Sequence, residues 1–298
     1  MIPIAESELI LDKRGGIYHL GIRPEEMAET ILLVGDPDRV KKVSRHFDSI
    51  EFKWQHREFI THTGYLNKKR ISVISTGIGP DNIDIAMNEI DALANIDFIS
   101  RTVNPALSSL QLIRLGTSGG LQKNIAVDSF VAGTHGLGFD NVMHFYTKQN
   151  TAAELEIIEA FKTHTGLTTG NVLPYIYEGS KNLLQTFSNG YTQGITIACP
   201  GFFGPQGRIL RLPLAYPGLV DKLSDFKHEQ HYVANFEMES SAIYGLGKLM
   251  GHQCISLNVI VANRVTKEFS KDSALAVDNL IKHSLAIISS TPSNERHY

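Results

Sequence analysis

The sequence predicts an α/β fold in which helices cover a mostly parallel or mixed β-sheet. Short apolar runs typical of strands alternate along the chain with longer stretches of helical period. Glycines also stand repeatedly where an expected strand passes into an expected helix. In sheets of this kind ligands bind beyond the carboxyl ends of the strands, so the glycine-rich turns are where a site is expected.

The first part of the chain begins with a strand–loop–helix unit and continues with a pair of strands. Apolar β-branched residues mark the strands, and capping residues or glycine-rich turns precede the helices. The expected elements are a strand at 30–35, a helix capped by Asp38 and running to about Phe47, strands at 59–66 and 70–75 around a turn at 67–69, and a helix at about 82–94.

The remainder of the chain continues the alternation after one irregular stretch. Residues 95–110 have no strong period and are expected to form an excursion from the sheet. A strand at 111–115 is expected to end in a glycine-rich turn at 116–120. The further expected strands lie at 129–133, 170–176, 195–198 and 254–262, and the further expected helices at 152–163, 235–250 and 273–288.

Composition and charge exclude several classes of protein. The 298 residues are 42% hydrophobic and 20% charged, with no linker-like segment, so a single domain over 1–298 is expected. The net charge of -3 is spread along the chain, which argues against nucleic acid or a membrane as partner. No leader pattern and no apolar run of about 20 residues is present, so a cytoplasmic location is expected. Cys199 and Cys254 have no metal-binding spacing, so neither a disulfide nor a metal site is expected.

Three arginines stand in segments suited to an anion. Arg39 follows Gly35 in a turn that opens a helix, and Arg114 precedes Thr117 in a glycine-rich segment. Backbone N–H groups, a helix N-terminus and bidentate guanidinium groups are good donors for phosphate oxygens. Arg57 is a third candidate. Each segment alone is as well explained by an ordinary turn, a solvated arginine or a surface ion pair.

Two carboxylates, Glu237 and Glu239, flank Met238 at the expected start of the helix at 235–250. Carboxylates in this position are stabilised by the helix dipole, and Glu239 could accept hydrogen bonds from two sugar hydroxyls. Acidic residues in a first helical turn more often only complement the dipole. The residues by themselves therefore leave both interpretations open.

Five segments occur together in one order, and this combination is more specific than any of its members. The segments are Gly35-Asp36-Pro37-Asp38-Arg39, His56-Arg57-Glu58-Phe59, Ser75-Thr76-Gly77-Ile78-Gly79, Arg114-Leu115-Gly116-Thr117-Ser118-Gly119 and Asn235-Phe236-Glu237-Met238-Glu239-Ser240. Over roughly residues 17 to 290 the chain resembles the nucleoside phosphorylase-I family, and within it the uridine phosphorylase branch. The resemblance implies a three-layer α/β/α fold with a central mixed sheet and a homo-oligomer whose active sites are shared between subunits.

The resemblance also implies roles for the phosphate and ribose residues. Inorganic phosphate, the co-substrate, would be bound by Gly35, Arg39, Arg114 and Thr117, with Arg57 supplied by a neighbouring subunit. Ribose would be bound by Glu239 through its hydroxyls, by Met238, by Glu237 and by His19 of the adjacent subunit. Three arginines around one site suit a multiply charged oxyanion and favour phosphate over water as the nucleophile.

The base would be a pyrimidine by the same resemblance. Phe202 would stack on it, Gln206 would pair with uracil, Arg208 would stabilise the departing ring, and Arg264 would lie near the uracil. Purine-cleaving relatives place an aspartate where this chain has Asn263, and asparagine cannot act as that acid. The implied catalytic set is Arg39, Arg114, Thr117, Arg208 and Glu239.

The implied reaction is the reversible phosphorolysis of uridine, or a related pyrimidine nucleoside, to base and ribose 1-phosphate, with no organic cofactor. A purine nucleoside phosphorylase, a nucleosidase and a non-catalytic nucleoside-binding protein remain alternatives. Glu58 matches a residue that helps to hold a monovalent cation in relatives, but Asn82 replaces a serine there, so the ion is not asserted. The excursion at 95–110 leaves dimer and hexamer both open.

Overall fold

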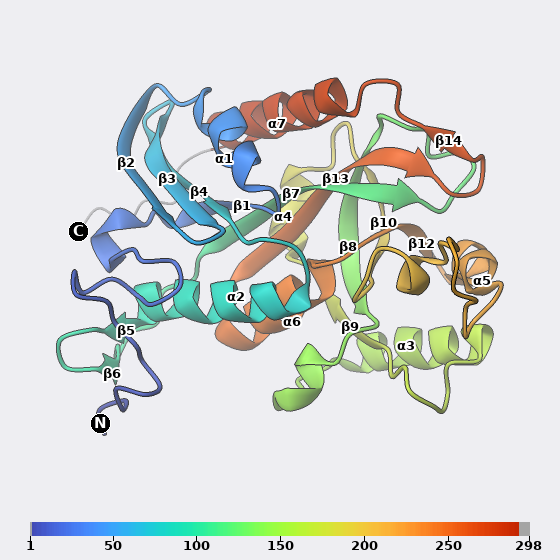
Figure 1. Ribbon diagram of the computed structural model, residues 1–298, viewed down its shortest axis with the longest axis horizontal. Helices are drawn as coiled ribbons and strands as arrows, with labels where there is room; N and C mark the ends of the chain where they lie inside the picture. The colour runs from blue at the N-terminus through green and yellow to red at the C-terminus, as the bar shows by residue number, and fades with distance from the viewer. Residues whose placement is uncertain (1, 292–298) are drawn as a thin grey trace.

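Alternating strands and helices build a mixed sheet with helices on both of its faces (Figure 1). The computed structural model describes residues 2–291. The strands are β1 (Thr30–Val34), β2 (Ser49–His56), β3 (Phe59–Leu66), β4 (Lys69–Ser75), β5 (Ile96–Asp97), β6 (Thr102–Val103), β7 (Gln111–Gly120), β8 (Phe130–Gly138), β9 (Tyr175–Glu178), β10 (Thr192–Ala198), β11 (Lys227–His228), β12 (His231–Glu237), β13 (Gln253–Asn263) and β14 (Glu268–Phe269).

The helices divide between the two faces of the sheet. They are α1 (Pro37–Ser44), α2 (Pro80–Asn95), α3 (Ala152–Thr165), α4 (Lys181–Thr186), α5 (Leu219–Asp225), α6 (Ser240–Met250) and α7 (Ser273–Ser290), with 3-10 turns η1 (Pro24–Glu26), η2 (Val142–Phe145) and η3 (Gly204–Gln206). Figure 1 shows α2 and α6 on one face and α1 and α7 on the other. Side chains of β1 alternate between the two cores, because Ile31 packs with α2 and α6 whereas Leu32 packs with α1 and α7.

The sheet closes on itself at one end. Its strand order is β11-β12-β10-β8-β13-β7-β1-β4-β3-β2, with β9 beside β8 and β14 beside β13. In addition β12 pairs with β7, through Phe236 opposite Gly119 and Asn235 opposite Gly120. The strands from β12 to β7 therefore form a ring, and the carboxyl ends of β7 and β12 meet. Gly119 permits this closure, since a Cβ there would lie 3.0 Å from the Phe236 ring.

Most of the expected elements are confirmed. The strand at 59–66 is β3, the adjacent strand begins one residue earlier than expected, and the turn between them contains Asn67 and Lys68, both with positive φ. The expected helices at 82–94, 152–163 and 273–288 correspond to α2, α3 and α7. None of the helices in the described part of the chain combines the length and apolar character needed to span a bilayer.

Three expectations about the elements are wrong. The glycine-rich segment at 116–120 is not a turn but the second half of β7, because its small residues allow β12 and β13 to pair closely on either side. The segment 235–250 is not one helix: it begins as the end of strand β12, and the helix starts at Ser240. The strand expected at 170–176 is displaced to β9, Tyr175–Glu178, where it pairs with β8.

Smaller differences have local causes. The cap of α1 is Asp36 rather than Asp38, since its side chain accepts a hydrogen bond from the Asp38 amide at 2.9 Å. The sequence analysis missed β2, an edge strand in which exposed residues such as Glu51 and Lys53 alternate with the only partly buried Phe52 and Trp54. The excursion at 95–110 contains the short antiparallel pair β5–β6, separate from the main sheet.

Candidate active site

A cavity of about 270 Å³ opens where the carboxyl ends of β1, β7, β12 and β13 meet the loop after β10. This is the location at which α/β sheets bind ligands. The cavity brings together most of the residues that the sequence singled out. Its lining includes Gly35, Arg39, Arg114, Thr117, Phe202, Gln206, Arg208, Glu237, Met238 and Glu239.

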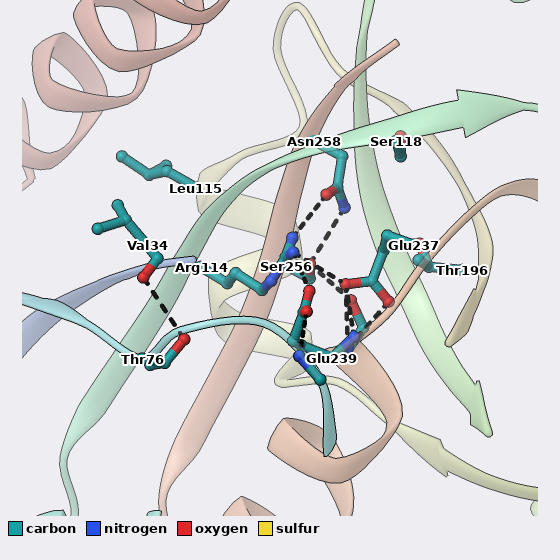
Figure 2. Close-up of polar contacts among 12 residues, drawn as sticks. Val34, Thr76, Arg114, Leu115, Ser118, Thr196, Glu237, Glu239, Ser256 and Asn258 are labelled. Carbon is teal, nitrogen blue, oxygen red and sulfur yellow. Dashed lines mark hydrogen bonds and ion pairs between the residues drawn. The ribbon is translucent and has the colours of Figure 1, made fainter. Parts of the chain in front are cut away.

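Arg114 is the centre of a buried charge cluster (Figure 2). Its Nη1 donates to Asn258 Oδ1 at 2.8 Å, and its Nη2 donates to Glu239 Oε2 and lies 3.2 Å from Glu237 Oε2. The guanidinium occupies the space above Gly116, where a Cβ would lie 1.7 Å from Nη1. A glycine at position 116 is therefore a steric requirement for this arginine conformation.

Glu237 caps helix α6 from the end of β12. Its carboxylate accepts hydrogen bonds from the amides of Glu239, at 3.0 Å, and Ser240, at 2.9 Å. The helix start thus stabilises a carboxylate as expected, but that carboxylate is Glu237 rather than both acidic residues. Burial raises the pKa of Glu237 to about 7, an effect that Arg114 opposes and Glu239 reinforces.

Glu239 connects two separate parts of the chain. Its Oε1 accepts a hydrogen bond from the Gly79 amide at 2.8 Å, just before α2, while its Oε2 accepts from Arg114. Gly79 has a φ of 103°, a conformation that favours glycine and that points this amide at the carboxylate. Glu239 is consequently held in one orientation in the middle of the cavity, next to Met238.

A second arginine completes the cationic end of the cavity. Arg39, in the first turns of α1, donates from Nη1 to the carbonyl of Leu115 at 3.0 Å. Burial, and then the nearby Arg114, lower the pKa of Arg39 from its ordinary value. Two guanidinium groups, the Thr117 side chain and the turn at Gly35 thereby surround one end of the cavity, as an oxyanion would require.

The opposite end of the cavity carries an amide and a guanidinium group. Gln206 is buried, and its Oε1 accepts a hydrogen bond from Arg208 Nη1 at 2.6 Å. The Arg208 guanidinium lies 3.7 Å from the centre of the Phe202 ring, an arrangement typical of a cation–π contact. Burial, and then the charge of Arg264, lower the pKa of Arg208 to about 10, so this side chain is still charged at neutral pH.

Arg264 is near this end but does not line the cavity. Its Nη1 donates to the Gln206 carbonyl at 2.9 Å and its Nη2 to the Gly207 carbonyl at 3.3 Å. These bonds hold the backbone that presents Gln206 and Arg208. In this structure Arg264 therefore supports the loop rather than facing the cavity.

Asn263 also lies away from the cavity, and its amide is fully occupied. Nδ2 donates to the carbonyls of Gln122 and Ile125, both at 2.8 Å, and Oδ1 accepts from the amides of Val265 and Thr266, both at 2.9 Å. The asparagine thus organises the turn between β13 and β14. This position, where purine-cleaving relatives place an aspartate, does not line the cavity in this structure.

His19 and Arg57 lie together outside the cavity of their own chain. His19 Nδ1 is 2.7 Å from Glu89 Oε1, and the His19 carbonyl lies 3.0 Å from the ring of His56. The neighbouring Tyr18 hydroxyl accepts a hydrogen bond from Arg57 Nη2 at 3.4 Å. Arg57 is exposed and has a φ of 53° in the turn between β2 and β3.

Several residues at the cavity escaped the sequence analysis. Phe236 stands inside a quoted motif but was given no role, and Asn258 lies within a strand with nothing in the sequence to mark it. Val261, Ala262 and Phe269 line the cavity because β13 and β14 bend over it. Pairing between distant strands, rather than a local pattern, brings these residues to the site.

Known proteins resemble the chain over most of its length. Residues 29–289 match the model of the phosphorylase superfamily. A uridine phosphorylase of Thermococcus kodakarensis is 29% identical over 91% of this chain and 87% of its own length, and one of Haemophilus influenzae is 23% identical over 87% and 91%. A solved Trypanosoma brucei nucleoside phosphorylase, described as showing uridine phosphorylase activity, has a TM-score of 0.87 and 28% identity, covering 95% of this chain and 100% of that one.

Proposed function

Because the chain belongs to the phosphorylase superfamily, we propose that it is a uridine phosphorylase, which uses inorganic phosphate to convert uridine reversibly into uracil and ribose 1-phosphate. The observation that carries this proposal is the polarity of the cavity. The buried Arg114, the half-buried Arg39 and Thr117 form one end, and Gln206 with Arg208 forms the other. An anion and a neutral base with carbonyl groups fit these two ends, and the ribose fits between them beside Glu239.

The phosphate end supports phosphorolysis. Arg39 and Arg114 line the cavity with their guanidinium N–H donors, and Thr117 adds a hydroxyl. Arg114 contacts the carboxylates of Glu237 and Glu239, which limits the uncompensated positive charge at this end of the cavity. The buried Arg114 and the half-buried Arg39 are a costly pair of cations to place around a neutral water molecule, so a nucleosidase is the weaker proposal.

The chemical step needs no side-chain nucleophile. A phosphate oxygen forms a bond to C1′ of the ribose while the bond from C1′ to N1 of the base breaks, and the bonding electron pair leaves with the base. Arg208 and Gln206 would stabilise the charge that develops on the uracil carbonyl oxygens, and the base is then protonated from solvent. Glu239 would accept hydrogen bonds from the ribose hydroxyls and hold C1′ above the phosphate.

The position of His19 and Arg57 supports shared sites in a homo-oligomer. Both side chains are on one surface, tied together through Tyr18 and His56, and neither lines the cavity of its own chain. An outward-facing arginine next to a half-exposed histidine is suited to complete the cavity of a second copy. In this proposal Arg57 adds to the phosphate site of the partner and His19 approaches its ribose.

The protein requires no organic cofactor in this proposal, and phosphate acts as co-substrate. A monovalent cation between subunits is a separate possibility that Glu58 suggests and Asn82 weakens, and it is not part of the proposed reaction. The single-domain organisation likewise stays a prediction.

The test is to incubate the protein with uridine, thymidine or inosine, with and without phosphate, and to measure free base and ribose 1-phosphate. We expect uridine cleavage that requires phosphate and produces equal amounts of uracil and ribose 1-phosphate. Cleavage without phosphate would identify a nucleosidase, and a preference for inosine would identify a purine nucleoside phosphorylase. Tight uridine binding without turnover would show a nucleoside-binding protein instead.

A further inference from the structure

A series of buried hydrogen bonds connects the interior of the sheet to the lining of the cavity. Thr196 on β10 donates from Oγ1 to Asn235 Oδ1 at 2.8 Å, and Asn235 on β12 donates from Nδ2 to Ser118 Oγ at 2.8 Å. Thr196 and Asn235 have no exposed surface, and Ser118 lines the cavity. Figure 2 draws Ser118 and Thr196 on the same side of the site as Glu237.

Thr196, at the buried end of this series, determines which groups in it donate and which accept. An asparagine amide turned by 180° would accept from Ser118 and donate to Thr196. Thr196 would then have to donate its own hydroxyl hydrogen elsewhere, and within residues 2–291 it has no other hydrogen-bond partner. Because a buried hydroxyl without an acceptor is destabilising, the orientation in which Thr196 donates to Asn235 is favoured.

The orientation of the Asn235 amide determines how Ser118 can form hydrogen bonds. Its oxygen already accepts a hydrogen bond from Asn235, and its hydroxyl hydrogen has no acceptor among the described residues. A serine hydroxyl is normally able to either donate or accept. The hydrogen bond from Asn235 therefore leaves Ser118 able to donate its hydrogen only into the cavity.

The neighbours of Ser118 indicate what would receive this hydrogen bond. Gly119 follows it on β7 and pairs with Phe236, whose ring lies 6.0 Å from the guanidinium carbon of Arg208 and 5.7 Å from that of Arg264. Phe236 and Arg208 line the cavity together with Ser118, Phe202 and Gln206, whereas Arg264 lies behind them. Ser118 consequently faces the part of the site that the base occupies in the proposed function.

We propose that Ser118 donates a hydrogen bond to a carbonyl oxygen of the pyrimidine base, and that Asn235 and Thr196 are positioning residues that hold it as a donor. The proposal rests on the proposed function. Negative charge collects on the base carbonyl oxygens as the glycosidic bond breaks, so a donor fixed in direction stabilises the departing base more than the bound nucleoside. A hydrogen-bond acceptor at this position would instead repel the negatively charged carbonyl oxygen of the base.

The first experiment compares Ser118→Ala with Ser118→Thr. Ser118→Ala is expected to lower kcat/KM for uridine about 10-fold, mostly through kcat, while the KM for phosphate is unchanged. Ser118→Thr keeps a hydroxyl and is expected to recover most of the loss. Equal rates for wild type and Ser118→Ala would overturn the proposal, and so would a loss that Ser118→Thr fails to reverse.

The second experiment changes a residue that does not line the cavity. Thr196→Val removes the group that fixes the amide, so Asn235 can turn and accept from Ser118, and the loss in kcat should approach that of Ser118→Ala. In the double variant, Thr196→Val should add little to Ser118→Ala, because both act through one donor. Additive losses would overturn the positioning role.

A matched control separates this effect from general destabilisation. Thr165→Val removes another buried threonine hydroxyl, one that donates to the Phe161 carbonyl at 2.8 Å far from the cavity. It is expected to lower the unfolding temperature while kcat for uridine is unchanged. An inactive wild-type protein would contradict the proposed function itself, whereas an active wild type with unaffected Ser118 variants would contradict only this inference.

Discussion

Gly116 shows how a single hydrogen atom in place of a side chain shapes the site. The Arg114 guanidinium fills the space that a Cβ would need, and Asn258 Oδ1 would lie 2.6 Å from the same atom. From the sequence, Gly116 is only one glycine in a segment rich in them. Its particular importance depends on the rotamer of Arg114, which the carboxylates of distant Glu237 and Glu239 select.

Gly116→Ala is therefore expected to displace Arg114 and weaken phosphate binding. Losing charge-assisted hydrogen bonds of this kind corresponds to a rise in the KM for phosphate of about 10- to 100-fold. Steady-state kinetics with varied phosphate measure it. Gly204→Ala is the control, since a Cβ at Gly204 meets nothing within 4 Å; a similar rise in that variant would contradict the steric explanation.

Arg208 is the residue on which selection of a pyrimidine base most depends. Arg208→Ala is expected to lower kcat for uridine about 100-fold, because the donor opposite the departing base is removed, and to leave phosphate binding nearly unchanged. Kinetics with each substrate varied in turn measure the two effects. Arg211→Ala, at an exposed arginine without a partner in the described chain, should behave like wild type, and an unchanged uridine rate in Arg208→Ala would remove this residue from the base site.

At the scale of one element, the start of α6 links stability to pH. The pKa of Glu237 is raised from its ordinary value of 4.5 to about 7 in the folded protein, chiefly by burial. The folded state thus binds this proton more tightly than the unfolded state does. The contribution of Glu237 to stability is full below pH 4.5 and is lost as the pH rises toward 7.

Glu237→Gln should remove this part of the pH dependence. Between pH 4.5 and 7, the unfolding free energy of the variant is expected to fall by about 2 kcal/mol less than that of wild type. Urea unfolding at several pH values measures the difference. Parallel stability curves for the two proteins would show that Glu237 does not change its protonation in this range.

The turn between β13 and β14 gives a second prediction for an element. Asn263→Asp would remove the donor to two buried carbonyls and add a buried charge, so we expect a loss of about 2–5 kcal/mol in unfolding free energy and no gain of inosine cleavage. Urea unfolding and an inosine assay test both statements. Asn124→Asp, at an exposed site, is the control; appearance of inosine cleavage in Asn263→Asp would place this side chain at the base after all.

The helix expected at 235–250 illustrates what local pattern could not resolve among the elements. Tyr232 to Phe236 carries strand-forming residues, but the acidic residues that follow resemble a helix start, and the boundary between the two lies in Glu237-Met238-Glu239. Residues 233–237 form a strand rather than a helix because the pairing of β12 with β10 and β7 buries them in the sheet. Helices with a strong hydrophobic period and one buried face, such as α2 and α7, could be predicted from the sequence pattern alone.

At the scale of the whole molecule, the site is expected to be completed by a second copy. In the proposed oligomer Arg39 and Arg57 act at one phosphate but belong to different subunits. Arg39→Ala and Arg57→Ala should each be nearly inactive, whereas co-expressed subunits of the two variants should form hybrids with one intact site and recover part of the activity. Activity of the purified hybrid measures this.

The control for that experiment pairs Arg39→Ala with Arg114→Ala. Both residues line the cavity of the same chain, so hybrids of these two variants contain no intact site and should stay inactive. Hybrids of Arg39→Ala with Arg57→Ala that are equally inactive would argue that His19 and Arg57 do not serve a neighbouring cavity.

The sequence by itself determined the α/β class, most helices and strands, and the residues at the two ends of the cavity, because hydrophobic period, glycine-marked strand ends and a run of five ordered motifs are properties of the chain. Only the tertiary structure decided that Arg114 is held between two carboxylates and Asn258, that Asn263 and Arg264 support loops, and that Thr196 orients Ser118. These facts depend on contacts between strands far apart in sequence. Local pattern records which residues are buried, but not which distant partners satisfy their hydrogen bonds.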